Sequence, residues 1–100
     1  MMDITGTYTE AELADFLEHK VVQKLSIVQL GLDRYELIMS LTWKPGNWRI
    51  ITLRKTPREW SSLDRLTKHI IKKSVNGLPQ IDLLLDARFN NTHSEDITDA

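Results

Sequence analysis

Three histidines and one pair of serines are the residues of this sequence that could support acid–base, metal or nucleophilic chemistry. His19, His69 and His93 fall on three different predicted elements. Asp15 and His19 are four residues apart on one helix face and could begin a metal site, but nothing else in the sequence completes one. The serines at 61 and 62 lack the glycine context of a hydrolase nucleophile, and the four glycines are too scattered for a phosphate-binding loop. We therefore expect a protein that is not an enzyme, with no catalytic residue, metal, cofactor or small-molecule substrate.

Positive charge is concentrated in the middle third of the chain. Between Lys44 and Lys73 there are nine Lys or Arg residues and two carboxylates, a net charge of +7, whereas the whole chain has a net charge of −1. Six of these cations are predicted to form a basic binding surface: Arg54, Lys55, Arg58, Arg65, Lys68 and Lys72. Such a surface could bind DNA or an acidic protein partner, although a solvated helix face would show the same pattern.

The length and composition predict an ordinary cytoplasmic protein. One hundred residues support a single domain, and the absence of cysteine excludes a disulfide scaffold or a thiolate metal site. No apolar run approaches the roughly 20 residues of a membrane-spanning helix. The N-terminus lacks the basic and apolar regions of a signal peptide, so no membrane partner is expected.

Spacing of apolar residues predicts two helices and four strands. The first helix is expected over about residues 10–20, because Thr9 and Glu12 have the spacing of a capping box and an apolar face follows. The second is expected to begin either at Pro57, behind a capping box formed by Thr56 and Glu59, or at Leu63, and to end before residues 76–77. Its predicted buried stripe contains Trp60, Leu63, Leu66, Ile70 and Ile71. The strands are expected over residues 24–32, 35–43, 48–55 and 80–86.

These elements predict an α+β fold in the order α-β-β-β-α-β. A right-handed crossover gives a four-stranded, mostly antiparallel sheet with strand order 3-2-1-4 and both helices on one face. The predicted domain covers residues 9–86, preceded by a flexible arm over residues 1–8 and followed by a disordered acidic tail over residues 87–100.

The turn at residues 44–47 is expected to place Trp43 opposite Trp48, a pair that we interpret as structural rather than as a ligand platform. In that register the second face of the sheet is not cleanly polar. It carries three apolar side chains, Ile38, Ile51 and Leu53. Either a further element covers them, or they form a self-association face and the protein is a homodimeric interaction module.

The segment LTWKPGNW at residues 41–48, followed by RKTPREWSSLDRL at residues 54–66, resembles the small ParC-type partition-associated proteins of bacterial plasmids and integrative elements. These proteins are unrelated to the topoisomerase subunit of similar name. The resemblance runs from about Leu13 to Leu85. It implies a cytoplasmic accessory factor of a mobile genetic element that acts with partition machinery or DNA, and it implies no particular functional residues.

Overall fold

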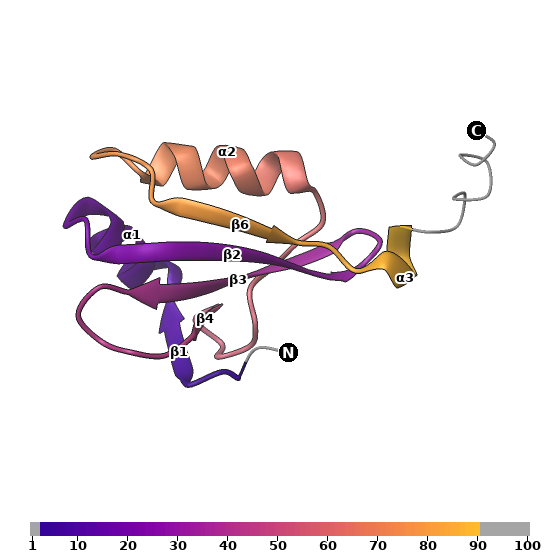
Figure 1. The fold of residues 1–100 in the computed structure, drawn as a ribbon, viewed down its shortest axis with the longest axis horizontal. Coiled ribbons are helices and arrows are strands. Elements are labelled where there is room, and N and C mark those ends of the chain that lie inside the picture. Colours follow the sequence, from indigo (N-terminus) through magenta and orange to yellow (C-terminus); the bar gives the residue numbers. More distant parts are fainter. Residues whose placement is uncertain (1–2, 91–100) are drawn as a thin grey trace.

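A six-stranded mixed sheet forms the frame of the computed structural model, which describes residues 3–90 (Figure 1). The elements in chain order are β1 (Gly6–Thr9), α1 (Glu10–Glu18), β2 (Val22–Gly31), β3 (Arg34–Leu41), β4 (Trp48–Ile51), β5 (Glu59–Trp60), α2 (Leu63–Lys73), β6 (Gln80–Leu84) and α3 (Ala87–Asn90). The strand order is β1-β4-β3-β2-β6, and β5 also pairs with β3. The pairs β1–β4 and β2–β6 are parallel and the others are antiparallel.

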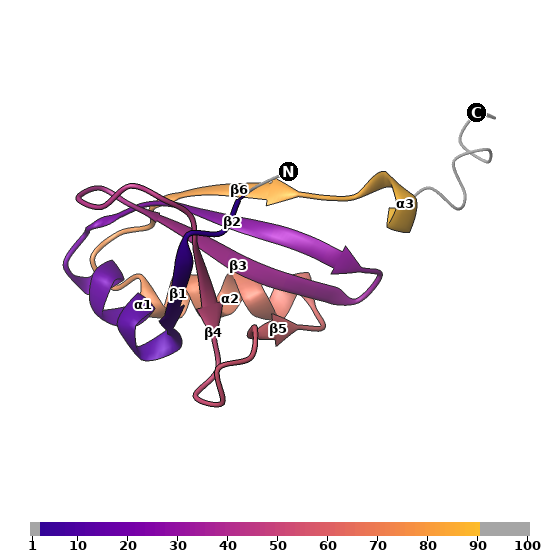
Figure 2. The same ribbon diagram turned by 90° about the horizontal axis from the view of Figure 1, so that it is seen from below.

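One face of the sheet packs against both long helices, which lie on the same side of it (Figure 2). Alternate residues of the central strands point to this side, as the period of two in a strand requires. The fully buried members of the core are Leu13 and Leu17 of α1, Leu25 and Ile27 of β2, Leu37 and Met39 of β3, Ile50 of β4, and Leu66 and Ile70 of α2. Burial of each such side chain contributes about 1.5–3 kcal/mol, so this one cluster holds the helices to the sheet.

The prediction of an α+β domain with two helices on one face is confirmed. The four expected strands are β2, β3, β4 and β6, and they lie in the path β4-β3-β2-β6 within the observed order. The prediction of four strands is wrong, because β1 and β5 join the sheet, and the sheet is mixed, with three antiparallel and two parallel strand pairs. Both missed strands are too short for an alternating pattern to reveal them.

The segment before α1 is part of the sheet. Residues 6–8 were expected in a flexible arm, but they belong to β1, which pairs in parallel with β4. The backbone N–H of Thr5 donates to the carbonyl oxygen of Asn47 at 2.7 Å and extends this contact. At the other end, residues 87–90 form α3, whereas the rest of the tail predicted over 87–100 lies outside the described residues.

The pairing of β3 with β4 differs from the predicted register. Trp48 lies opposite Met39 rather than Trp43, and Arg49 lies opposite Ile38. Because the shift is by four residues, an even number, every side chain keeps its predicted face. The connection is longer than the expected four-residue turn, since β3 ends at Leu41. The physical reason is β1, whose Tyr8 ring packs 5.2 Å from the Trp48 ring and holds the start of β4.

Two capping predictions have opposite outcomes. The capping box of α1 is confirmed: the N–H of Glu12 donates to Oγ1 of Thr9 at 3.2 Å, and the N–H of Thr9 donates to Oε1 of Glu12 at 2.8 Å. The box predicted at Thr56 and Glu59 does not form, because the Glu59 carboxylate accepts two hydrogen bonds from Arg34. The second helix therefore begins at Leu63, with the Ser62 hydroxyl accepting from the N–H of Arg65.

Candidate functional site

The two described histidines lie apart and have opposite environments. His19 is exposed, and the backbone carbonyl of Asp15 accepts from its ring at 2.8 Å and raises its pKa, assisted by the Asp15 carboxylate. His69 of α2 is partly buried beside Trp60, and burial lowers its pKa although its Nε2 lies 3.6 Å from Oε1 of Glu10. His93 lies outside the described residues. Among residues 3–90 no three His, Cys, Asp or Glu side chains are grouped as metal ligands.

Four cations, Arg65, Lys68, Lys72 and Lys73, make up what we call the basic face of α2. Arg65, Lys68 and Lys72 project from the side of the helix away from the buried Leu66 and Ile70. Lys73 follows Leu66 by seven residues and is exposed at the end of the helix. Lys68 forms an ion pair with Asp64 at 3.1 Å, and both side chains are well exposed. In the described part of the chain the other three cations form no ion pair. The helix has 11 residues and is therefore about 16 Å long, so these charges lie within one short surface.

Arg58 was predicted to be part of the basic binding surface, but its interactions are internal. Its Nε donates to Oε2 of Glu10 at 3.1 Å, and its Nη1 donates to the carbonyl oxygen of Glu59. The guanidinium also stacks 4.5 Å from the Trp60 ring. Arg58 thus connects the start of α1 to β5 and is not available as a phosphate ligand without breaking this contact.

Arg54 and Lys55 lie in the turn between β4 and β5, a different part of the molecule. Both are exposed and form no ion pair within residues 3–90, and Lys55 has a positive φ of 67°. The two ribbon views agree that this turn lies well away from α2 (Figures 1 and 2). The six predicted cations therefore do not form one continuous surface: three are on α2, two are in the turn, and Arg58 is held internally.

The three residues predicted as a self-association face do not form an exposed face. Ile38 is 2% exposed and Ile51 is 8% exposed, whereas Leu53 is 90% exposed. The backbone of Ile51 pairs with Thr9 of β1 on one side and with Pro57 on the other, two neighbours that the sequence analysis did not anticipate. The prediction that these three residues form a self-association face is therefore wrong, because Leu53 is the only one of the three that a partner could contact.

The apolar surface that the structure does expose lies elsewhere, at α2 and β6. Seven of the ten exposed large hydrophobic residues in the described chain fall between Ile71 and Leu85. The prediction that Ile71 belongs to the buried stripe is wrong, since this residue is 58% exposed. The run from Ile81 to Leu85 was interpreted only as a strand, and its aliphatic residues on both faces are equally typical of a strand that is buried on both faces.

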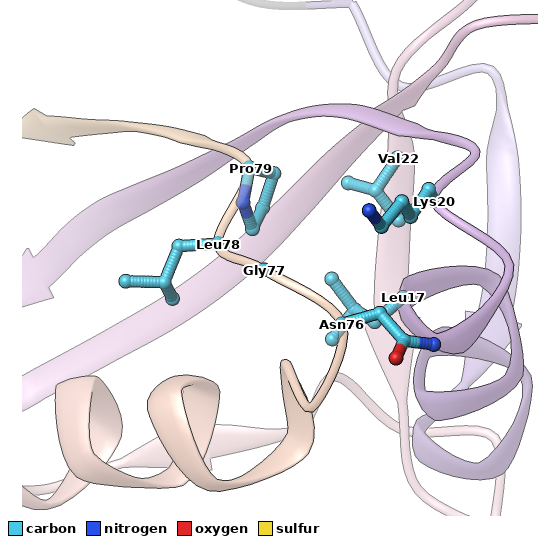
Figure 3. A pocket seen from close by; sticks show the side chains of 7 residues that line it. All are labelled: Leu17, Lys20, Val22, Asn76, Gly77, Leu78 and Pro79. Atoms are coloured by element: carbon cyan, nitrogen blue, oxygen red, sulfur yellow. The ribbon is translucent and has the colours of Figure 1, made fainter.

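A pocket of about 330 Å³ opens between the end of α1 and the loop that joins α2 to β6 (Figure 3). It is lined by Leu17, Lys20, Val22, Asn76, Gly77, Leu78 and Pro79. The amide nitrogen of Asn76 donates to the carbonyl oxygen of Glu18 at 2.6 Å and ties the loop to α1. The lining contains one cation and one amide but no carboxylate, histidine or hydroxyl, so these side chains supply no acid–base pair.

Comparisons with known proteins add no identification: no family model, no curated protein and no solved structure matches the chain. The resemblance to ParC-type proteins therefore stays a prediction. In residues 3–90 there is also no helix with the length and apolar character needed to cross a bilayer.

Proposed function

We propose that this chain is a non-enzymatic accessory protein of a plasmid or mobile genetic element, and that it binds duplex DNA through the basic face of α2. The observation that supports this proposal is the exposure of Arg65, Lys72 and Lys73 on one short helix, with no carboxylate of the described residues paired to them. Duplex DNA carries about one negative charge per 1.7 Å of its axis, so a helix of this length faces several phosphates at once.

The test is binding of a mixed-sequence duplex of about 20 base pairs, followed by fluorescence anisotropy between about 50 and 200 mM salt. Affinity is expected to fall steeply with salt, because phosphate contacts release counterions. The double variant Arg65→Gln/Lys72→Gln should bind more weakly and lower the slope of log K against log salt by about 2, since each lost phosphate contact removes about 1.

A matched control removes the same charge elsewhere. Lys20→Gln/Arg88→Gln also neutralises two exposed cations, but neither residue lies on α2. This variant should keep the salt dependence of the parent protein. Equal weakening by both double variants would mean that only net charge matters, and absence of binding at about 50 mM salt would exclude DNA as the partner.

An acidic protein segment is a second candidate partner, and one observation favours it. Ile71 is exposed on α2 between Lys68 and Lys72, so the helix offers apolar contact next to charge. Mixed surfaces of this kind are typical of protein–protein interfaces rather than of phosphate contacts. At protein concentrations low enough for the chain to be monomeric, an acidic peptide that contains leucines would then bind and would lose affinity in Ile71→Gln, whereas DNA binding under the same conditions would be unaffected by that substitution.

A further inference from the structure

The exposed aliphatic residues near the end of the chain lie on and around one edge of the sheet, and we call them the β6 strip. Its members are Ile71, Val75, Leu78, Ile81, Leu83, Leu84 and Leu85, with exposed fractions from 37% to 73%. Ile71 lies on α2, and Val75 and Leu78 lie in the loop that follows. The other four lie in β6 or directly after it.

β6 is an edge strand with an unpaired side. Within the described residues it pairs only with β2, and it forms the end of the sheet opposite to β1 (Figure 2). α2 lies next to β6 in the view of Figure 1, and Figure 2 places it on the helix-covered face of the sheet. His69 of α2 contacts Glu10, so that flank of the helix faces α1. Ile71 is two residues further on and therefore projects from the opposite flank. The backbone edge and the exposed apolar side chains are thus side by side.

The two edges of the sheet differ in how they are protected. β1 has four residues and presents glycine, threonine and tyrosine. β6 carries Ile81, Leu83 and Leu84, and its single charged residue, Asp82, is paired with Lys24 of β2 at 3.3 Å. Natural edge strands usually avoid such exposure through charge, proline or covering elements. An aliphatic edge without these features is therefore a template for pairing with another strand.

We propose that a second copy of this chain occupies the edge, with β6 of each copy paired antiparallel about a two-fold axis to form one continuous sheet. An antiparallel pair of identical strands is self-complementary, as an isologous interface requires. A register centred on Leu83 places Ile81 opposite Leu85 of the partner and Asp82 opposite Leu84 of the partner. The neighbouring register centred on Asp82 would place two carboxylates face to face, which is unfavourable.

The exposed area of the β6 strip is large enough for a small interface with a second copy of the chain. From the exposed fractions, the strip offers on the order of 500 Å² per copy, or roughly 1,000 Å² for the pair, compared with about 1,200–2,000 Å² for specific interfaces that include a polar rim. The expected dimer is therefore at the small end of this range. It should form and dissociate in the micromolar range of concentration rather than persist on dilution.

Sedimentation velocity between about 1 and 300 µM tests the proposal, with a concentration-dependent shift from monomer to dimer as the expected result. Leu83→Lys places two ammonium groups opposite each other at the two-fold axis and should raise the dimer dissociation constant at least about tenfold. Ile71→Lys should act in the same direction from α2, outside the strand. Leu53→Lys is the matched control, because Leu53 is 90% exposed but lies outside the strip, and it should leave the dimer intact.

Circular dichroism and a thermal melt of each variant show whether the monomer is folded, which is expected because the substituted side chains are already exposed. Hydrogen exchange supplies a second measurement: β6 amides should exchange more slowly at high concentration than at low concentration in the parent protein. A strict monomer at about 300 µM overturns the proposal, and so does a dimer that survives Leu83→Lys. Binding of strictly monomeric protein to phosphatidylcholine–phosphatidylglycerol vesicles through the strip would also overturn it, and would identify a lipid surface as the occupant.

Discussion

Gly6 and Trp48 lie in direct contact where β1 pairs with β4. A Cβ atom on residue 6 would lie 2.6 Å from Cζ3 of Trp48 and 3.0 Å from Cε3, closer than carbon atoms approach without displacement. Trp48 is 9% exposed and packs against the ring of Tyr8, so its indole has little freedom to move. The absence of a side chain at residue 6 is therefore what allows the N-terminal strand to join the sheet.

Gly6→Ala should destabilise the fold by about 1–3 kcal/mol, the usual cost of forcing an extra group into a packed site. Gly31→Ala is the matched control, because the nearest atom to a Cβ there is 3.5 Å away and belongs to the flexible side chain of Arg34. Equilibrium unfolding in urea measures both variants, and tryptophan fluorescence reports the environment of Trp48. Equal stability of the two variants would show that β1 does not pack against β4 as described.

Glu36 and Arg49 form an ion pair on the outer face of the sheet. The Glu36 side chain is 6% exposed and accepts from Nε of Arg49 at 2.8 Å. Arg49→Met leaves that buried carboxylate without its partner, and should lower the free energy of unfolding by about 1–3 kcal/mol. The double variant Glu36→Gln/Arg49→Met should recover part of the lost stability, because it removes the buried and unpaired charge of Glu36.

Arg34 and Glu59 provide the control for this prediction. They form the same bidentate contact, but their side chains are 58% and 37% exposed. Arg34→Met should therefore change stability much less than Arg49→Met, because water replaces the lost partner. If urea unfolding finds the two single variants equally destabilised, burial of Glu36 does not determine the strength of the pair.

The strands of the core could be predicted from sequence because each has a periodic pattern of its own. Leu37, Met39 and Leu41 alternate with less apolar residues, and they face the helices as the pattern indicates. The register between β3 and β4 could not be predicted in this way. It depends on β1, a four-residue strand distant in sequence that packs Tyr8 against Trp48. A local turn signal at residues 44–47 carries no information about that contact.

The candidate site was predicted less well than the fold, for a related reason. Spacing along α2 correctly identifies Arg65, Lys68 and Lys72 as exposed, because one helix determines their direction. The spacing of residues along one element cannot show which cation forms an ion pair with a carboxylate on another element. Arg58 pairs with Glu10, which is 48 residues away in sequence. The β6 strip was missed because a strand with apolar residues on both faces looks the same whether it is central or at an edge.

His69 should make stability depend on pH near neutrality. Burial lowers its pKa below the ordinary value of 6.5, so the folded state resists protonation. Well above pH 6.5 the ring is neutral in both states and does not affect the free energy of unfolding. As the pH falls from 6.5 toward the lowered pKa, the unfolded chain binds a proton that the folded chain does not, and stability decreases. His69→Gln should lack this decrease when urea unfolding is measured between about pH 7.5 and 5.5.

His19 changes the pH dependence of stability in the opposite direction, so its contribution must be separated from that of His69. Its pKa is raised by the Asp15 carbonyl and carboxylate, so its contribution is present at low pH and is lost as the pH rises through the raised pKa. The difference between the parent protein and His69→Gln removes the His19 contribution, since both proteins contain it. The carboxylates with lowered pKa, such as Glu59, titrate in more acidic solution and do not interfere. Parallel pH profiles for the two proteins would contradict the assigned environment of His69.

The two proposals together make a joint prediction about DNA. Because both long helices lie on one face of the sheet, a two-fold axis perpendicular to the paired β6 strands would place two copies of α2 on the same side of the dimer. The neutral double variant Ile71→Gln/Leu83→Gln should then reduce the salt dependence of DNA binding to about half that of the dimer, because a monomer offers half the phosphate contacts. Leu53→Gln should leave the slope unchanged. If sedimentation shows Ile71→Gln/Leu83→Gln to be monomeric and its slope still equals that of the parent protein, a single α2 makes all the phosphate contacts and dimerisation serves another purpose.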